Sequence, residues 1–242
     1  MSMALLFFII AAVYSTVGFG GGSSYIAVLV LFGLPYQDIP SISLLCNLLV
    51  VSSGTYHFIK NGHFSWPLAK TFLTTSIPMA FLGGLIPISK QTFTLTLGIL
   101  LILVGIRLLW ARNELSQPIL RIPFSTSLAF FFGSVLGFFS GLVGIGGGIF
   151  LSPLLIGLGW GKPKQIAATA SLFILLNSLA GLIGQVVKNR ANPEILQYWP
   201  FFLAVFLGGQ LGSKVGSNWL PQLWIVRLTS ILVIWVGLRL VF

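Results

Sequence analysis

Long apolar runs separated by short polar segments organise this chain. A helix needs about 20 consecutive apolar residues to cross the roughly 30 Å hydrocarbon core of a bilayer. Six uninterrupted runs meet or approach that length, and each predicts one membrane span: 41–59, 67–86, 93–111, 166–187, 199–217 and 222–242. Two further apolar stretches are interrupted by glycines, which predicts two broken elements: 3–18 followed by 23–33, and 124–143 followed by 149–159.

The glycine interruptions are Gly18-Phe-Gly-Gly-Gly22 and Gly144-Ile-Gly-Gly-Gly148. Each Gly destabilises a helix interior by about 1 kcal/mol relative to Ala, so three in a row do not sustain a regular helix. The backbone groups that such a break frees must be buried in protein or must line a wet cavity when they lie at membrane depth. We therefore expect the two breaks to have a function.

The order of sequence landmarks predicts two homologous repeats of about 120 residues. After each glycine motif come a short apolar stretch, a helix with small polar residues, a Lys-Asn pair, a Trp-Pro pair and a closing Val-Gly-x-Arg-Leu. These pairs of landmarks are Lys60 with Lys188, Trp66 with Trp199, and Val104 with Val236. We predict a first repeat over 1–115, a polar linker over 116–123 and a second repeat over 124–242, with eight to ten membrane segments in total.

The topology depends on the path of each broken element. If it crosses the membrane once, each half has four crossings and the repeats are parallel. If it turns back as a hairpin, the crossings per half are odd and the repeats are inverted. Lys and Arg gather on the cytoplasmic side of membrane proteins, and their distribution favours the inverted arrangement with both termini outside.

Composition supports a membrane protein and excludes several other classes. Of the 242 residues 56% are apolar and only 7% are charged, whereas soluble domains carry about 25% charged residues. The net charge of +10 does not predict nucleic-acid binding, because the basic residues lie singly or in pairs between apolar runs instead of on one face. The three carboxylates, Asp38, Glu114 and Glu194, all fall in predicted loops.

The breaks are the first candidates for chemistry. A helix that begins after a glycine break presents free N–H groups and a partial positive charge, so it binds anions without a cationic side chain. Two such starts from two repeats can meet near the midplane of a transporter. The candidate backbone donors and the serine that follows the first break are Gly20, Gly21, Gly22, Ser23, Gly146, Gly147 and Gly148.

Polar residues inside the apolar spans are the second candidates. Ser43 and Asn47 follow the first break, and Ser171 and Asn177 are their approximate counterparts after the second; Gln185 and Gln210 are further donors. The alternative is interhelical hydrogen bonding, which is common for such residues in membranes. The glycines at every fourth position predict close helix packing: Gly133, Gly137 and Gly141, and Gly208, Gly212 and Gly216.

An enzyme is not expected. The H-E-x-x-H helix of intramembrane metalloproteases is absent, and Ser140 has no histidine in its own half of the chain. The single cysteine, Cys46, excludes an intramolecular disulfide and a cysteine-based metal cluster. We predict no catalytic residues, no metal and no cofactor.

The two Gly-x-Gly-Gly-Gly motifs, the helix start Ala167-Ala-Thr-Ala-Ser171 with Asn177, and the loop Lys60-Asn-Gly-His-Phe-Ser-Trp66 resemble the TauE/SafE family of membrane proteins. The resemblance covers nearly the whole chain. It departs in the first half, where Ser23 and Ser24 follow the glycines and no proline matches Pro153. It implies transport of small sulfur-containing anions, such as sulfite, sulfoacetate or other organosulfonates, across the cytoplasmic membrane.

The sequence therefore predicts a multi-pass transporter of the cytoplasmic membrane that works by alternating access around a midplane site between the two breaks. With no carboxylate deep in a span, export down the electrochemical gradient is the favoured direction. The expected partners are a small anion and the lipid bilayer, with no nucleic acid. An anion channel, or a membrane subunit that binds or assembles without transporting, is the alternative. The sequence leaves the oligomeric state open.

Overall fold

The structure is a computed structural model, and it describes residues 3–16, 18–110, 123–189, 193–216, 234, 235, 237, 238 and 241. All regular elements in these ranges are helical, as predicted. In chain order they are α1 (Met3–Ser15), α2 (Gly22–Leu31), α3 (Ile39–Lys60), α4 (Trp66–Leu85), α5 (Lys90–Trp110), α6 (Thr126–Val143), α7 (Gly148–Leu158), α8 (Pro163–Asn189), the 3-10 helix η2 (Pro193–Tyr198) and α9 (Trp199–Gly216).

Both broken elements are present, and their breaks fall at the two glycine motifs. In the described ranges, five helical segments are long and apolar enough to cross a membrane: Ile39–Lys60, Trp66–Leu85, Thr126–Val143, Lys164–Lys188 and Ile195–Val215. Three shorter apolar helices, α1, α2 and α7, accompany them. The predicted linker lies almost entirely outside the described residues, as does the last predicted span, 222–242. The chain is a helical, multi-pass membrane protein.

Helices α1, α3 and α9 pack together as one bundle, which we call the first bundle. Gly208 and Gly212 of α9 lie against the backbone of Phe8 and Ala12 of α1, so a Cβ at either glycine would overlap that backbone. The two helices run parallel, because the later residue of α9, Gly212, meets the later residue of α1, Ala12. Small residues let helix backbones approach closely in lipid, where packing replaces the hydrophobic effect.

Helices α4, α6 and α8 form the second bundle. Gly133, Gly137 and Gly141 of α6 lie against the backbone of α4 at successive turns, and Gly141 also meets Gly181 of α8. These three helices also run parallel to one another. The predicted glycine seams are confirmed at Gly133, Gly137 and Gly141 and at Gly208 and Gly212.

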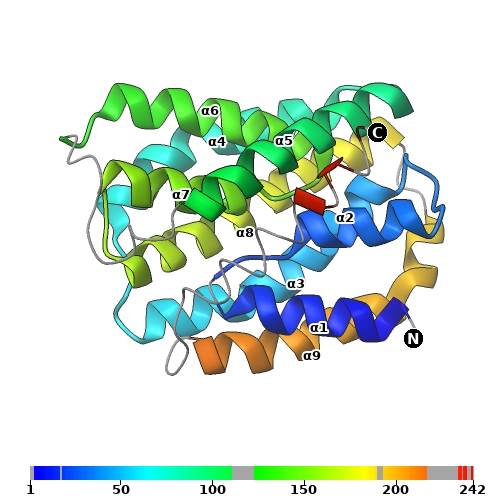
Figure 1. Cartoon of the computed structure of the whole chain (residues 1–242), viewed down its shortest axis with the longest axis horizontal. Helices are drawn as coiled ribbons and strands as arrows, with labels where there is room; N and C mark the ends of the chain where they lie inside the picture. Colours follow the sequence, from blue (N-terminus) through cyan, green and yellow to red (C-terminus); the bar gives the residue numbers. More distant parts are fainter. Residues whose placement is uncertain are drawn as a thin grey trace.

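The two bundles meet where α3 packs on α8, and there the chains run in opposite directions. Gly54 near the end of α3 lies beside Ser171 near the start of α8, whereas Leu44 near the start of α3 lies beside Gly181 farther along α8. Figure 1 shows the same arrangement, with α1, α3 and α9 side by side below and α4 and α6 above. The first bundle thus runs antiparallel to the second.

Both broken elements turn back as hairpins. The first glycine of one break, Gly18, lies at the level of Gly54 and Ser171, whereas its last glycine, Gly22, lies at the level of Ser43. The chain therefore reverses between α1 and α2 and returns toward the start of α3. The second break reverses in the same way, since Gly144 abuts Pro40 and α7 returns to a cluster that includes Ile166.

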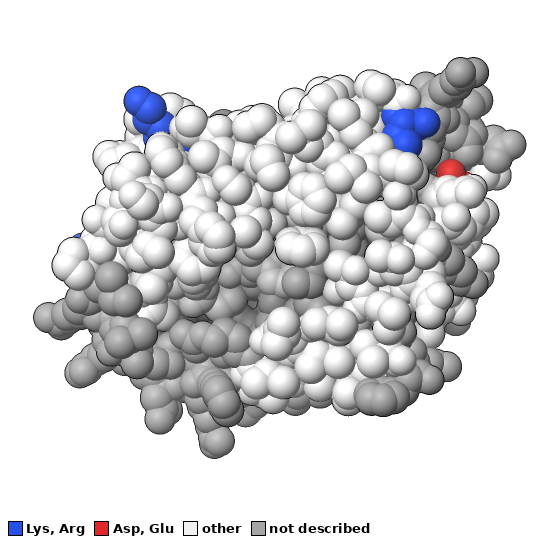
Figure 2. All heavy atoms as spheres, turned by 90° about the horizontal axis from the view of Figure 1, so that it is seen from above, with Lys and Arg blue, Asp and Glu red and all other residues white. Residues whose placement is uncertain are grey.

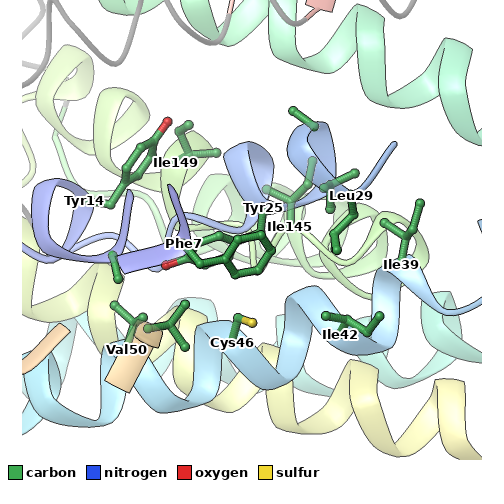
Figure 3. Close-up of a cluster of buried hydrophobic side chains, with 14 of the residues drawn as sticks. Phe7, Tyr14, Tyr25, Leu29, Ile39, Ile42, Cys46, Val50, Ile145 and Ile149 are labelled. Atoms are coloured by element: carbon green, nitrogen blue, oxygen red, sulfur yellow. The ribbon is translucent and has the colours of Figure 1, made fainter. Parts of the chain in front are cut away.

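The hairpins interlock through one apolar cluster. Phe7 of α1 stacks on Tyr25 of α2, with ring centroids 4.9 Å apart. Ile145 and Ile149 of the second hairpin join the same buried cluster, which also includes Cys46 of α3 (Figure 3). The cluster holds the tip of each hairpin against the other.

The surface matches a bilayer environment. Large apolar side chains are exposed on several helices, for example Phe131 at 61% and Leu211 at 57%. In water such a surface drives association, whereas in lipid it is the natural exterior. On the face in Figure 2, Lys and Arg lie toward the two ends of the long axis, and the described residues between them carry no charge. This pattern places the helix ends at the two membrane surfaces.

Candidate functional site

The two hairpin tips, residues 18–22 and 144–148, meet in the interior of the protein. A Cβ on Gly22 would lie 2.5 Å from the carbonyl oxygen of Ile145, so no larger residue fits there without a shift of backbone. Gly21 and Gly147 stand directly before α2 and α7 with φ values of 86° and 78°. Glycine adopts this left-handed conformation without the steric penalty of a side chain. The glycines are therefore required by both the turn and the close approach.

Ser43 of α3 holds both tips. Its hydroxyl lies 2.8 Å from the Gly144 carbonyl oxygen and 3.2 Å from that of Gly22, and it donates to these acceptors. Ser171 of α8 donates to the Gly18 carbonyl oxygen at 2.9 Å. A serine of α3 thus secures the second tip, and a serine of α8 secures the first.

Asn47 lies at the centre of this meeting point. Its amide nitrogen donates to the carbonyl oxygen of Ile145 at 3.0 Å, whereas its Oδ1 is buried without a hydrogen-bond partner. A Cβ on Gly22 or Gly146 would lie 2.6 Å or 2.7 Å from the Asn47 Nδ2, and Gly20 crowds the Oδ1. The structure therefore brings Gly20, Gly22, Ser43, Asn47 and Gly146 together.

Asn177 does not join that group. It lies one turn after Phe173, which packs in a cluster with residues of α4 and α7, whereas Ser171 faces the first tip. Asn177 is fully buried, and neither its Nδ2 nor its Oδ1 has a hydrogen-bond partner. The six-residue spacing between Ser171 and Asn177 rotates them to different sides of a 3.6-residue helix, which separates Asn177 from Asn47.

The remaining predicted residues lie at the helix starts. Ser23 is buried in the first turn of α2, and its neighbour Ser24 bonds to the Tyr14 hydroxyl at 2.6 Å. Gly148 begins α7 and lies against Ile174 of α8. No side chain caps α2 or α7, so their first-turn N–H groups and the positive ends of their dipoles face the protein interior.

Every buried polar side chain in the described part of the protein is neutral. Helix dipoles and hydroxyl and amide groups therefore set the electrostatic potential around the tips. The described acidic residues Asp38 and Glu194 stand at the start of α3 and in η2. The described residues contain no cluster of His, Cys, Asp or Glu that could hold a metal ion. This environment suits a small anion better than a cation.

Sequence reasoning missed three buried serines of the second bundle: Ser76, Ser140 and Ser178. Each is fully buried and its hydroxyl has no hydrogen-bond partner. A signal was available, since Ser140 stands between the packing glycines Gly137 and Gly141, and Ser178 directly follows Asn177.

Gln185 and Gln210, the two glutamine candidates, bind within the protein. Gln185 donates to the Gly141 carbonyl oxygen at 3.0 Å. Gln210 accepts from the Ser53 hydroxyl at 2.9 Å, in a network where Ser53 also meets Ser213 at 2.8 Å. The Nδ1 of His57 lies 2.9 Å from the Ser53 carbonyl oxygen. Such bonds fit the interhelical alternative for these residues.

At the membrane surface, the loop between α3 and α4 carries His63. Burial, together with the positive charge of Lys164 at the start of α8, lowers the pKa of His63 below its usual value. Both effects disfavour the protonated ring.

The chain matches known proteins along its full length. Residues 3–240 match the family model "Sulfite exporter TauE/SafE". The "Probable membrane transporter protein y4hK" of Sinorhizobium fredii is 35% identical over 244 residues, which cover 100% of this chain and 98% of that protein. The "Probable membrane transporter protein YunE" of Bacillus subtilis is 26% identical over 269 residues, 99% of this chain and 96% of the relative. No solved structure matches the chain. The chain belongs to the TauE/SafE family of membrane transporters.

Proposed function

We propose that this protein exports small sulfur-containing anions, such as sulfite, sulfoacetate or other organosulfonates, across the cytoplasmic membrane by alternating access. One observation carries the proposal: two helices without side-chain caps, α2 and α7, begin at hairpin tips that meet around Asn47 in neutral surroundings. Helix starts of this kind bind anions. The family description supports sulfite and related anions as the substrate class.

The proposal includes an inverted repeat, with 1–115 and 124–242 as its halves and 116–123 as the linker. The packing supports it, because the fourth α-helix of each half packs against the first helix of the other half: α9 against α1, and α4 against α6. Ser43 and Ser171 bind the equivalent glycines of the opposite breaks, Gly144 and Gly18. Rocking of the first bundle against the second then opens the site to each side of the membrane in turn.

Each site residue has a proposed role. Backbone N–H groups of residues 20–23 and 146–148 supply donors to the anion. Ser43, Asn47 and Ser171 position the tips, since their donor groups are bonded to tip carbonyls. Asn177 orients the oxyanion with its free amide group.

Export needs no carboxylate relay. A negative cell interior favours exit of an anion by about 2.3 kcal/mol per charge per 100 mV. That gradient drives uniport outward, or the anion carries a proton with it.

Counterflow into proteoliposomes at clamped membrane potential tests this function. Saturable uptake of labelled sulfite or sulfoacetate, driven by unlabelled anion inside the vesicle, is expected of a carrier. Uptake without saturation or counterflow would indicate a channel. A folded protein that moves neither anion would indicate an assembly role and would contradict the proposal.

A matched pair of variants links transport to the tips. Gly22→Ala forces a Cβ against Ile145 and Asn47, so we expect counterflow to fall more than about tenfold. Gly62→Ala introduces the same side chain in the loop after α3, at φ 73°, where nothing lies within 4 Å. The Gly62 variant should keep most of its activity. Equal activity of both variants would remove the tips from the mechanism.

A further inference from the structure

The second bundle contains a layer of buried polar side chains without partners. Ser76 of α4, Ser140 of α6, and Asn177 and Ser178 of α8 are all 0% exposed. None of their side-chain oxygens, nor the Asn177 amide nitrogen, has a hydrogen-bond partner. Unpartnered buried polar atoms destabilise a fold, so four such side chains on three packed helices point to a missing ligand.

Helix register places these residues within about one turn of one another, since Gly137, which packs on Ser76, lies three residues before Ser140. Gly141 packs on Ala80 and on Gly181, and Ser76 and Asn177 precede Ala80 and Gly181 by one turn of parallel helices. The turn before that is apolar, where Phe72 and Phe173 belong to one buried cluster. The polar layer therefore lies between an apolar layer and the close-packed glycine layer.

The start of α7 borders the same layer. A Cβ on Gly147 would lie 3.3 Å from the Cβ of Ser140, and one on Gly146 would lie 3.1 Å from the Oγ of Ser178. Because α7 has 11 residues and no side-chain cap, the N–H groups of Gly148 and Ile149 come before the first bond to the Gly147 carbonyl, which Phe150 makes. These N–H groups and the positive dipole end lie near two unpartnered hydroxyls.

The start of α2 is different, because protein oxygens already occupy its surroundings. The Ile145 carbonyl oxygen packs against Gly22, where a Cβ would lie 2.5 Å away. Ser24 is bonded to Tyr14 at 2.6 Å. The two helix starts are therefore not equivalent.

We propose that the anion binds on one side only, at the start of α7, with its oxygens held by Ser140, Asn177, Ser178 and the first-turn N–H groups. A sulfite or sulfonate group has three oxygens that accept hydrogen bonds, and this layer offers neutral donors without a competing carboxylate. Ser76 completes the polar lining. This inference rests on the proposed function, and it replaces a symmetric site between both tips with a one-sided one.

The test combines stability and transport in the full chain. Ser140→Ala, Ser178→Ala and Asn177→Leu each remove an unpartnered polar group, so melting temperature without anion should stay level or rise. Stabilisation by added sulfite or sulfoacetate should be lost, and the half-saturation concentration in counterflow should rise about tenfold or more, as for a hydrogen bond to a charged group.

Ser213→Ala is the control in the first bundle, where the hydroxyl has a partner, Ser53, at 2.8 Å. This variant should melt at a lower temperature and keep its half-saturation concentration. If Asn177→Leu does not fold, Asn177→Asp keeps the side-chain shape and places a carboxyl group against the anion, which should abolish binding.

Three results would overturn the one-sided site. Normal counterflow with half-saturation within twofold of the parent in all three variants would refute it and leave the proposed function standing. A lower melting temperature with unchanged half-saturation would assign the serines a structural role. A parent protein that neither transports nor is stabilised by either anion would refute both proposals.

Discussion

The two bundles share a backbone plan but differ in how they treat polar side chains. In each, glycines of one helix lie against the backbone of a helix from the other half of the chain. In the first bundle, Ser53, Gln210 and Ser213 bond to one another. In the second, Ser76 and Ser140 have no partner. The first bundle also has buried oxygens without a partner, Thr55 Oγ1 and Asn47 Oδ1, so the contrast concerns the serines: those at the contact of α3 with α9 bond to one another, whereas we propose that those between α4, α6 and α8 bind a ligand.

The largest expected loss of stability tests the close glycine packing that the two bundles share. Gly141→Ala and Gly212→Ala each drive a Cβ into a backbone carbonyl, of Ala80 and of Ala12 respectively. Overpacking of this kind destabilises by about 1–3 kcal/mol or more, and we expect a similar loss of melting temperature in both. A variant that melts like the parent would show that its seam is loosely packed.

The next prediction compares the two serines that hold the tips. Ser43→Ala leaves the Gly144 and Gly22 carbonyls without their donor, whereas Ser171→Ala affects only Gly18. Loss of such bonds typically destabilises by about 1–3 kcal/mol when a buried group stays unpaired. Maximal counterflow rate should fall more in Ser43→Ala than in Ser171→Ala. The reverse order would mean that the first tip governs transport.

A matched pair of serine variants tests whether removal of a hydroxyl destabilises the first bundle but not the second. Ser53→Ala breaks bonds to Gln210 and Ser213, and it should destabilise by about 1 kcal/mol. Ser76→Ala removes a hydroxyl without a partner, and it should be neutral or stabilising by up to about 1 kcal/mol. Thermal unfolding in detergent without anion measures both. Equal destabilisation by Ser53→Ala and Ser76→Ala would contradict the proposed difference between the bundles.

The smallest effect lies at the membrane surface. Lys164→Met removes the positive charge that helps to lower the pKa of His63, so this pKa should rise while remaining affected by burial. At a pH near the midpoint, the ring is then protonated in a larger fraction of molecules. A histidine-selective NMR titration of His63 in the parent and the variant measures this. An unchanged pKa would assign the whole shift to burial.

The sequence alone predicted the helices but not how they pack together. Apolar run length and the triple glycines predicted the described α-helices to within a few residues, because both depend on local physics, whereas the 3-10 helix η2 was not predicted. Helix starts such as Pro163 instead of 166 differ because the first turn needs no apolar residue. The hydrophobic pattern alone could not decide the path of the broken elements, since a hairpin and a crossing share one pattern; only the distribution of Lys and Arg favoured the hairpin.

The candidate site was predicted in part. Ser43 and Asn47 were found because polar residues in apolar spans are rare, and they do lie at the tips. Asn177 was paired with Asn47 by chain order, but helical phase places Asn177 on a different face of α8 from Ser171. Ser76 was not singled out, because only the packing of α4 on α6 and α8 shows that it is buried without a hydrogen-bond partner.

The Ser43 hydroxyl has a consequence for motion. A hydroxyl carries a single hydrogen, so it serves one of its two acceptors fully at any instant, at 2.8 Å from Gly144 or 3.2 Å from Gly22. Rotation about its side-chain torsion transfers the bond from one tip to the other. The tips can therefore slide a short distance past each other while the Ser43 hydroxyl keeps one of its two hydrogen bonds, the shorter to Gly144 or the longer to Gly22.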